Sequence, residues 1–108
     1  MKGEGREGIA AYLLRMRARG ISDRRLLAAI EATPREDFIP GQWINAAYSG
    51  RMIPIDCGES IEGLDLQTHI FATLDVQQNH RILEIGTGSG FTAAVLARLG
   101  QRVTTVDR

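Results

Sequence analysis

Apolar residues recur at helical spacing in the first third of the chain, which predicts two helices there. The first is expected over residues 7–19, with Gly20 ending it in a left-handed conformation. Its apolar face would consist of Ile9, Tyr12, Leu13 and Met16. The second is expected to begin at an N-cap, Ser22, and to end before Pro34. Its apolar face would consist of Leu26, Leu27 and Ile30.

The middle of the chain has a weaker pattern. Prolines and glycines interrupt residues 34–60, which predicts irregular structure with one brief strand over residues 51–55. A third helix is expected over residues 65–74. Its apolar side would consist of Leu66, Ile70, Phe71 and Leu74.

The hydrophobic pattern is different in the last third of the chain. Residues 81–85 and 102–107 are short apolar runs typical of buried strands, and residues 91–99 between them follow a helical pattern. Gly100 would close that helix. The order of strand, glycine loop, helix and strand predicts one right-handed βαβ unit. We therefore expect an α/β fold, with an N-terminal helical region followed by the first βαβ unit of a doubly wound, Rossmann-like sheet.

The loop after the first of these strands suggests a bound ligand. Gly86, Gly88 and Gly90 alternate there, and glycine allows positive φ and close approach to the backbone. The next helix would direct its N-terminal amides at that ligand. Asp107 lies 21 residues beyond Gly86, at the end of the next strand, where a carboxylate can accept bonds from ribose hydroxyls. A nucleoside-type cofactor is expected, and a glycine-rich turn without a ligand is the alternative.

Composition limits the protein class. The 108 residues suit one domain, and 44% hydrophobic with 24% charged residues is ordinary for a folded chain. Thirteen basic residues balance thirteen acidic ones, so no overall charge favours nucleic acid or an anionic membrane. The longest apolar run, residues 9–14, is too short to span a membrane. The single cysteine, Cys57, fits a reducing compartment, so we expect a cytoplasmic protein.

Several motifs, in register, carry a resemblance to a known family. In sequence order they are Thr33-Pro34-Arg35-Glu36-Asp37-Phe38-Ile39-Pro40, Ala47-Tyr48, Ile53-Pro54-Ile55, Gly58-Glu59-Ser60-Ile61 and Ile82-Leu83-Glu84-Ile85-Gly86-Thr87-Gly88-Ser89-Gly90-Phe91. The glycine spacing GxGxG, rather than the dinucleotide pattern GxGxxG, resembles motif I of class I S-adenosylmethionine-dependent methyltransferases. The whole set, from about residue 9 onward, resembles protein-L-isoaspartate O-methyltransferase. A nicotinamide dehydrogenase is the runner-up on cofactor.

The resemblance implies methyl transfer from S-adenosyl-L-methionine to the carboxylate of L-isoaspartyl residues in damaged proteins or peptides. Residues 1–60 would supply helices and a substrate-side loop, and residues 61–108 would begin the cofactor-binding domain. Ser60 and Glu62 are the candidate catalytic residues. The candidate cofactor-binding residues are Ile61, Glu84, Gly86, Thr87, Gly88, Ser89, Gly90 and Asp107. No metal site is expected, because His69 and His80 lie apart with no Cys/His cluster near them.

Two departures from the family keep other hypotheses open. Glu62 stands where the family has a second hydroxyl, and an ionised acid there would repel a carboxylate substrate. A methyltransferase with a different substrate is therefore one alternative. The family continues for roughly another hundred residues, so the chain is expected to be an N-terminal half with a bare apolar strand edge. Self-association through that edge, in a non-catalytic interaction module, is the other alternative.

Plain structural roles compete with some of these assignments. Ser60 would cap the following helix, and Glu62 would be a solvated acid near its first turn. The arginines at 15, 17 and 19 do not share one helical face and are expected to be solvated. Trp43 and Phe38 are expected to anchor an irregular loop on the core.

Overall fold

The computed structural model describes residues 2–55, 58–86 and 88–106, and for residues 2–7 the backbone alone. Within these ranges the elements, in chain order, are α1 (Lys2–Ala18), α2 (Arg24–Glu31), the 3-10 helices η1 (Arg35–Phe38) and η2 (Gly41–Ala46), β1 (Ile53–Pro54), β2 (Ser60–Ile61), α3 (Leu64–Leu74), β3 (Arg81–Ile85), α4 (Phe91–Leu99) and β4 (Arg102–Val106).

The two N-terminal helices form where the sequence predicts them, with different ends. Helix α1 begins at Lys2, five residues before the expected start, and Gly20 follows it with φ of 83°, as predicted. Helix α2 is capped by Asp23, not by Ser22. The Asp23 carboxylate accepts bonds from the backbone N–H groups of Arg25 and Leu26. Both residues are good caps, and the side chain one position later is the one that reaches the free amides.

The βαβ unit is confirmed. Strands β3 and β4 are parallel, with Ile82 opposite Val103 and Glu84 opposite Thr105, and α4 connects them. Gly100 ends α4 as expected, in extended backbone. Glycine suits this position, because a Cβ atom would lie 3.0 Å from the carbonyl oxygen of His80 and 2.8 Å from the end of the Ile82 side chain, Cδ1, so both would have to shift.

The expectation that both strands are buried is wrong for one face of the sheet. Side chains alternate along a strand, so helix α4, which packs on β4, covers one face only. Ile82 and Val103 pack against the core from that side. Leu83, Ile85 and Val106 are 64%, 81% and 49% exposed.

The apolar side predicted for α3 is also wrong. Of the four residues, only Phe71 is buried, and Leu66, Ile70 and Leu74 are exposed. The buried face is largely polar and consists of Leu64, Asp65, Gln67, Thr68 and Phe71. This is possible because each buried polar side chain has a hydrogen-bond partner from another element.

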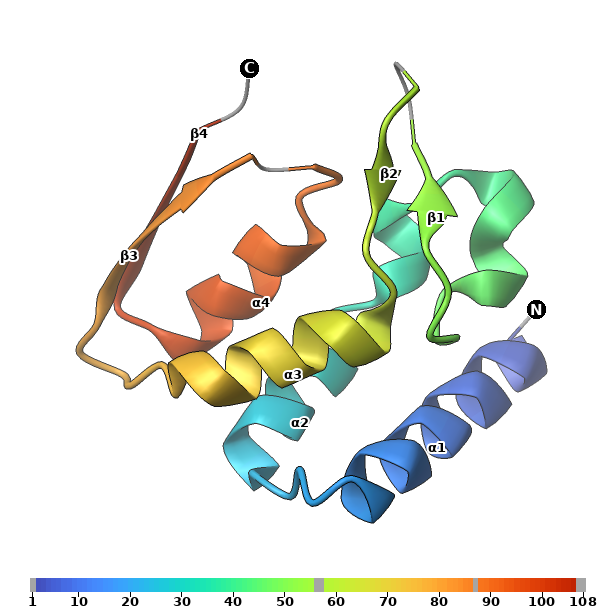
Figure 1. Ribbon diagram of the computed structural model, residues 1–108, viewed down its shortest axis with the longest axis horizontal. Coiled ribbons are helices and arrows are strands. Elements are labelled where there is room, and N and C mark those ends of the chain that lie inside the picture. Colours follow the sequence, from blue (N-terminus) through green and yellow to red (C-terminus); the bar gives the residue numbers. More distant parts are fainter. Residues whose placement is uncertain (1, 56–57, 87, 107–108) are drawn as a thin grey trace.

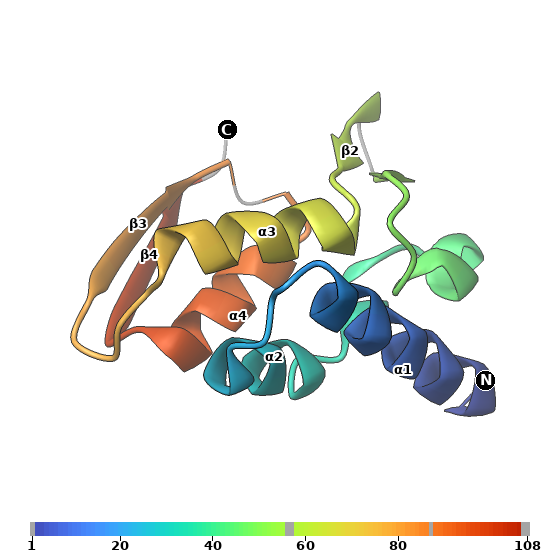
Figure 2. The same cartoon turned by 60° about the horizontal axis from the view of Figure 1, so that its bottom comes forward.

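The sheet of β3 and β4 stands at one end of the molecule, and the small hairpin of β1 and β2 stands across from it, with α3 and α4 between them (Figure 1). Helices α1 and α2 lie below α3 (Figure 2). Helix α2 packs on α4. Arg25 strengthens this contact, because it donates to the carbonyl oxygen of Val76 at 2.8 Å and to that of Leu99. Buried residues from Tyr12 to Leu99 form one hydrophobic core.

The irregular middle segment is tied to that core. The strand predicted over residues 51–55 is present but shorter, as the two residues of β1, which pairs antiparallel with β2 so that Ile53 faces Ile61. Phe38 and Trp43 pack against the core, as predicted. The Phe38 ring meets the Phe91 ring edge-on, with centroids 5.8 Å apart. None of the described helices is long and apolar enough to cross a membrane.

Candidate functional site: a cleft between the glycine loop and residues 59–62

A cleft of about 390 Å³ separates the glycine loop from the end of the hairpin. Its walls come from residues 59–62, both buried and exposed side chains of α3, strand β3 and the first turns of α4. The volume falls within the roughly 300–1,000 Å³ typical of small-molecule sites. Of the predicted site residues, the lining includes Ser60, Ile61, Glu62, Glu84, Gly86, Gly88 and Ser89.

The glycine loop has the backbone that its sequence predicts. Gly86, Gly88 and Gly90 all have positive φ, at 82°, 59° and 92°. A Cβ atom on Gly86 would point into open space, and one on Gly88 would lie 3.3 Å from Ile61 Cγ2. Glycine at 88 therefore lets the loop approach the opposite wall of the cleft closely.

Glu84 is held in place at the end of β3. Its carboxylate accepts a hydrogen bond from the Thr105 hydroxyl at 3.1 Å and another from the hydroxyl of Thr92, in the first turn of α4. Two donors fix the orientation of a half-buried acid that lines the cleft. Thr92 was not among the predicted site residues, and nothing in the local sequence pattern indicates that its hydroxyl faces Glu84.

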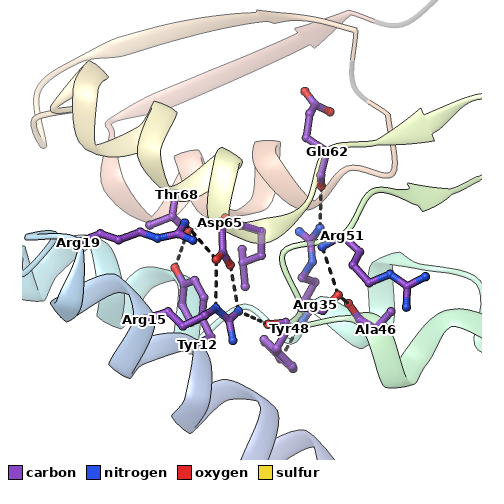
Figure 3. A network of polar contacts seen from close by, with 12 residues as sticks. Tyr12, Arg15, Arg19, Arg35, Ala46, Tyr48, Arg51, Glu62, Asp65 and Thr68 are labelled. Atoms are coloured by element: carbon purple, nitrogen blue, oxygen red, sulfur yellow. Dashed lines mark hydrogen bonds and ion pairs between the residues drawn. The ribbon is translucent and has the colours of Figure 1, made fainter.

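Ser60 and Glu62 lie on the opposite wall, and both are exposed. Ser60 belongs to β2 and does not cap α3, because the N-cap of α3 is Gly63. Glu62 precedes that cap, and its carboxylate points away from the Arg35 guanidinium (Figure 3). The interpretation of Glu62 as a solvated acid is confirmed.

Three predicted residues, Thr87, Gly90 and Asp107, remain to be accounted for. Gly90 caps α4 and lies against Phe38 rather than among the residues that line the cleft. Thr87 and Asp107 lie outside the described residues. Their assignments stay predictions.

Arg35 lies beneath the cleft, fully buried. Nη1 donates to Gln67 Oε1 at 2.6 Å, and Nη2 donates to the carbonyl oxygen of Glu62 at 3.1 Å. The guanidinium stacks over the Phe91 ring, 4.6 Å from its centroid. Burial lowers the pKa of Arg35 to about 10. The sequence gives no signal for this burial beyond the Thr33–Pro40 motif that contains the residue.

Polar contacts link the C-terminal part of α1 to the buried face of α3, the helix that contributes to one wall of the cleft (Figure 3). The Arg15 guanidinium donates twice to Asp65, and Arg19 lies 3.2 Å from the same carboxylate. The hydrogen bonds to Asp65 raise the pKa of Arg15. The prediction of solvated arginines is wrong for Arg15, which is half-buried against Asp65, and is confirmed for Arg17 and Arg19, which are exposed. Tyr12 meets Thr68 in the same layer, and burial raises the pKa of Tyr12 to about 12.

No group of three or more His, Cys, Asp or Glu side chains among the described residues is arranged to hold a metal ion. The residues lining the cleft instead offer glycine backbone, three hydroxyl side chains and three carboxylates, with apolar side chains around them.

Comparison with known proteins identifies the family. A profile of the family described as Protein-L-isoaspartate(D-aspartate) O-methyltransferase (PCMT) matches residues 9–108. The chain belongs to this family. A Rhizobium meliloti protein-L-isoaspartate O-methyltransferase is 48% identical over 95 residues, which are 88% of this chain and 47% of the relative. The Ruegeria pomeroyi enzyme of the same name is 39% identical over all of this chain and half of its own length. The chain thus spans about half the length of the curated relatives it matches.

Solved PCMT structures share the fold. A Plasmodium falciparum protein described as a PCMT, crystallised with S-adenosyl-L-homocysteine, superposes with a TM-score of 0.75 at 18% identity, over 91% of this chain and 48% of that one. A second protein-L-isoaspartate O-methyltransferase gives a TM-score of 0.67 at 24% identity, over 92% of this chain and 33% of that one. The arrangement of helices, hairpin and βαβ unit is therefore that of a PCMT N-terminal half.

Proposed function

We propose that this PCMT-family protein acts in the transfer of a methyl group from S-adenosyl-L-methionine to the carboxylate of L-isoaspartyl residues in damaged proteins and peptides. The observation that carries the proposal is the cleft, which has the glycine loop on one wall and Ser60 to Glu62 on the other. Family membership supports the reaction, and the S-adenosyl-L-homocysteine in the Plasmodium falciparum structure supports the cofactor. We place the reaction in the cytoplasm, in keeping with the single cysteine.

The residues present fit such a cofactor. Positive φ at Gly86 and Gly88 leaves the loop backbone open to a ligand, and the N-terminus of α4 favours negative charge beside it. We assign the amino-acid end of the cofactor to Gly86 and Gly88, with Thr87, Ser89 and the fixed Glu84 carboxylate around it. Gly90, the N-cap of α4, would turn the loop into the helix whose N-terminus faces that end. Asp107 would accept bonds from the ribose hydroxyls. When bound, the cofactor supplies an electrophilic methyl group on a sulfonium sulfur.

The chain's own residues then have to position the acceptor. An isoaspartyl carboxylate, with an ordinary pKa of roughly 4, is already ionised at neutral pH and needs no general base. We assign Ser60 to donate a hydrogen bond to that carboxylate, and Ile61, buried against the glycine loop, to exclude water beside the methyl donor. In this scheme residues 1–60 form most of the substrate side, and residues 61–108 form the cofactor side.

The charge of Glu62 bears on whether the methyl acceptor is an anion. Its exposed carboxylate lines the cleft, where its negative charge would repel the carboxylate of an isoaspartyl substrate. For this reason a neutral or cationic acceptor is the second candidate. We expect Glu62→Ser to improve methylation of an isoaspartyl peptide; unchanged or lower turnover of that peptide would favour the second candidate.

Self-association is a separate proposal. Leu83 and Ile85 on β3 and Val106 on β4 are exposed apolar side chains on the uncovered face of the sheet, and Leu83 and Ile85 also line the cleft. Among the described residues β3 pairs only with β4, which leaves its other backbone edge open to a further strand. An apolar strand edge favours pairing with another chain. We expect gel filtration of the 108-residue chain to give a dimer or larger species. A stable, folded monomer would contradict this.

The cofactor is tested by calorimetric titration of the 108-residue chain with S-adenosyl-L-homocysteine, beside its Asp107→Ala variant. One-to-one binding that the substitution weakens would support the assignment. Equal binding by both chains would remove Asp107 from the site. No binding by the folded parent chain would contradict cofactor binding by these residues. A parallel titration with a reduced nicotinamide dinucleotide checks the other cofactor class.

A further inference from the structure

Arg35 connects three segments that the chain separates widely. It begins η1, and its guanidinium reaches the carbonyl oxygen of Glu62 before α3, the side chain of Gln67 within α3 and the ring of Phe91 at the start of α4. Glu62 and Gln67 line the cleft, and Phe91 directly follows Gly90 of the glycine loop. One side chain therefore joins two residues that line the cleft to the residue that directly follows the glycine loop.

Packing alone does not account for a guanidinium here. Arg35 is fully buried, yet its side-chain hydrogen-bond acceptors among the described residues are an amide oxygen and a backbone carbonyl, both uncharged. Its Nε has no hydrogen-bond partner within the described parts of the chain. A buried charge with no acid hydrogen-bonded to it destabilises the fold, and an apolar side chain of similar volume often does better.

A planar guanidinium does, however, offer what an apolar side chain lacks. Its two terminal nitrogens donate along one edge, while its face stacks on an aromatic ring. In this site the edge holds residues 62 and 67, and the face holds Phe91. The distance between the hairpin wall and the first turn of α4 is thereby set by one rigid group.

We propose that Arg35 is a positioning residue, which holds the 60–62 wall at a fixed distance from the glycine loop and so shapes the cleft for its ligand. The inference deepens the proposed function and rests on it, because the ligand it concerns is the cofactor assigned above. Arg35 itself does not line the cleft.

The test compares Arg35→Lys with Arg25→Lys. Arg25 is a matched control because it also donates to two carbonyl oxygens, those of Val76 and Leu99, which lie outside the cleft lining. Lysine keeps the charge but cannot donate along an edge and stack at once. Affinity for S-adenosyl-L-homocysteine is measured below the melting transition of each variant, together with amide hydrogen exchange.

We expect R35K to bind S-adenosyl-L-homocysteine about tenfold more weakly, while R25K binds as the parent chain does. In R35K, faster exchange should be confined to residues 60–63 and 89–92. A folded R35K with parental affinity would overturn the proposal.

Two further outcomes are separated by design. If the parent chain binds no S-adenosyl-L-homocysteine, the cofactor assignment fails, and the amide-exchange data alone decide the role of Arg35. Amide exchange in R35K that equals that of the parent chain, or that is as widespread as in R25K, overturns the positioning role. If R35K does not fold, Arg35→Met replaces it, because methionine fills the space without charge. Parental affinity in R35M would equally overturn the proposal.

Discussion

Arg15 binds Asp65 across 50 positions of sequence, with Nε to Oδ2 and Nη2 to Oδ1 both at 3.0 Å. The same nitrogen, Nη2, also donates to the carbonyl oxygen of Tyr48 at 2.7 Å. Paired parallel bonds of this kind fix the orientation of both groups. Helix α1, the buried polar face of α3 and the turn that follows η2 are thereby joined at one point.

Replacing Arg15 should therefore destabilise the fold. We expect Arg15→Gln to lower the free energy of unfolding by about 1–2 kcal/mol, because it leaves the nearly buried Asp65 carboxylate with Arg19 alone. Arg17→Gln, on the exposed side of the same helix, should change it by less than about 0.5 kcal/mol. Urea unfolding of the two variants measures the difference, and equal losses would show that the Arg15 pair does not contribute.

Gly63 is required by a close backbone contact rather than by its φ. It is the N-cap of α3 with φ of −62°, but a Cβ atom there would lie 2.2 Å from the carbonyl oxygen of Gly50. We expect Gly63→Ala to lower the melting temperature strongly, with a loss of about 1–3 kcal/mol or more from overpacking. Gly41→Ala is the control, because a Cβ atom at Gly41 meets nothing within 4 Å. A G63A melting temperature equal to that of G41A would contradict the contact.

The two tyrosines of the chain should ionise at a higher pH than tyrosine ordinarily does. Burial raises the pKa of Tyr12 to about 12, and burial together with the hydrogen bond to Glu36 raises that of Tyr48 well above its ordinary value. In urea, both should ionise near their usual pKa of roughly 10. Tyrosinate absorbance followed against pH, with and without urea, measures the shift. Native tyrosines that titrate as in urea would contradict their burial.

The same shifts predict how stability changes at high pH. The tyrosines hold their phenol protons to higher pH in the folded state than in the unfolded state. Their contribution to the free energy of unfolding is therefore complete below about pH 10 and is lost as pH rises through about 12. Arg35 acts in the opposite direction, because its pKa is lowered on folding to about 10. The two tyrosines outnumber it, so we expect net destabilisation between pH 10 and 12.

Local patterns predicted the βαβ unit well. The run from Arg81 to Ile85, the alternating glycines and the helix after them follow from neighbouring residues alone. The conformation of the loop is predictable for the same reason, because positive φ is a property of glycine itself.

Long-range partners were not predictable. The buried face of α3 looks unfavourable in sequence because it carries Asp65, Gln67 and Thr68, and it is buried because partners arrive from positions 50, 32 and 56 residues away. An amphipathic pattern scores such residues as exposed. Arg35 was missed as a buried residue for the same reason, since charge normally indicates a surface position.

The N-cap of α2 was predicted one residue too early. Ser22 and Asp23 both favour an N-cap, and one residue decides which side chain reaches the free amides of α2. Helix boundaries from sequence are uncertain by a few residues, which is enough to choose wrongly between neighbours.

The central claim, that the glycine loop binds the cofactor, is tested most directly by two matched glycine substitutions. Gly86 and Gly20 have φ of 82° and 83°, and a Cβ atom on either would meet nothing within 4 Å, but only Gly86 lines the cleft. Gly86→Ala and Gly20→Ala should lose similar stability, about 1 kcal/mol each. Calorimetric titration with S-adenosyl-L-homocysteine should show binding weakened about tenfold in G86A and unchanged in G20A. Equal affinities in the two variants would contradict the assignment of the cofactor to this loop.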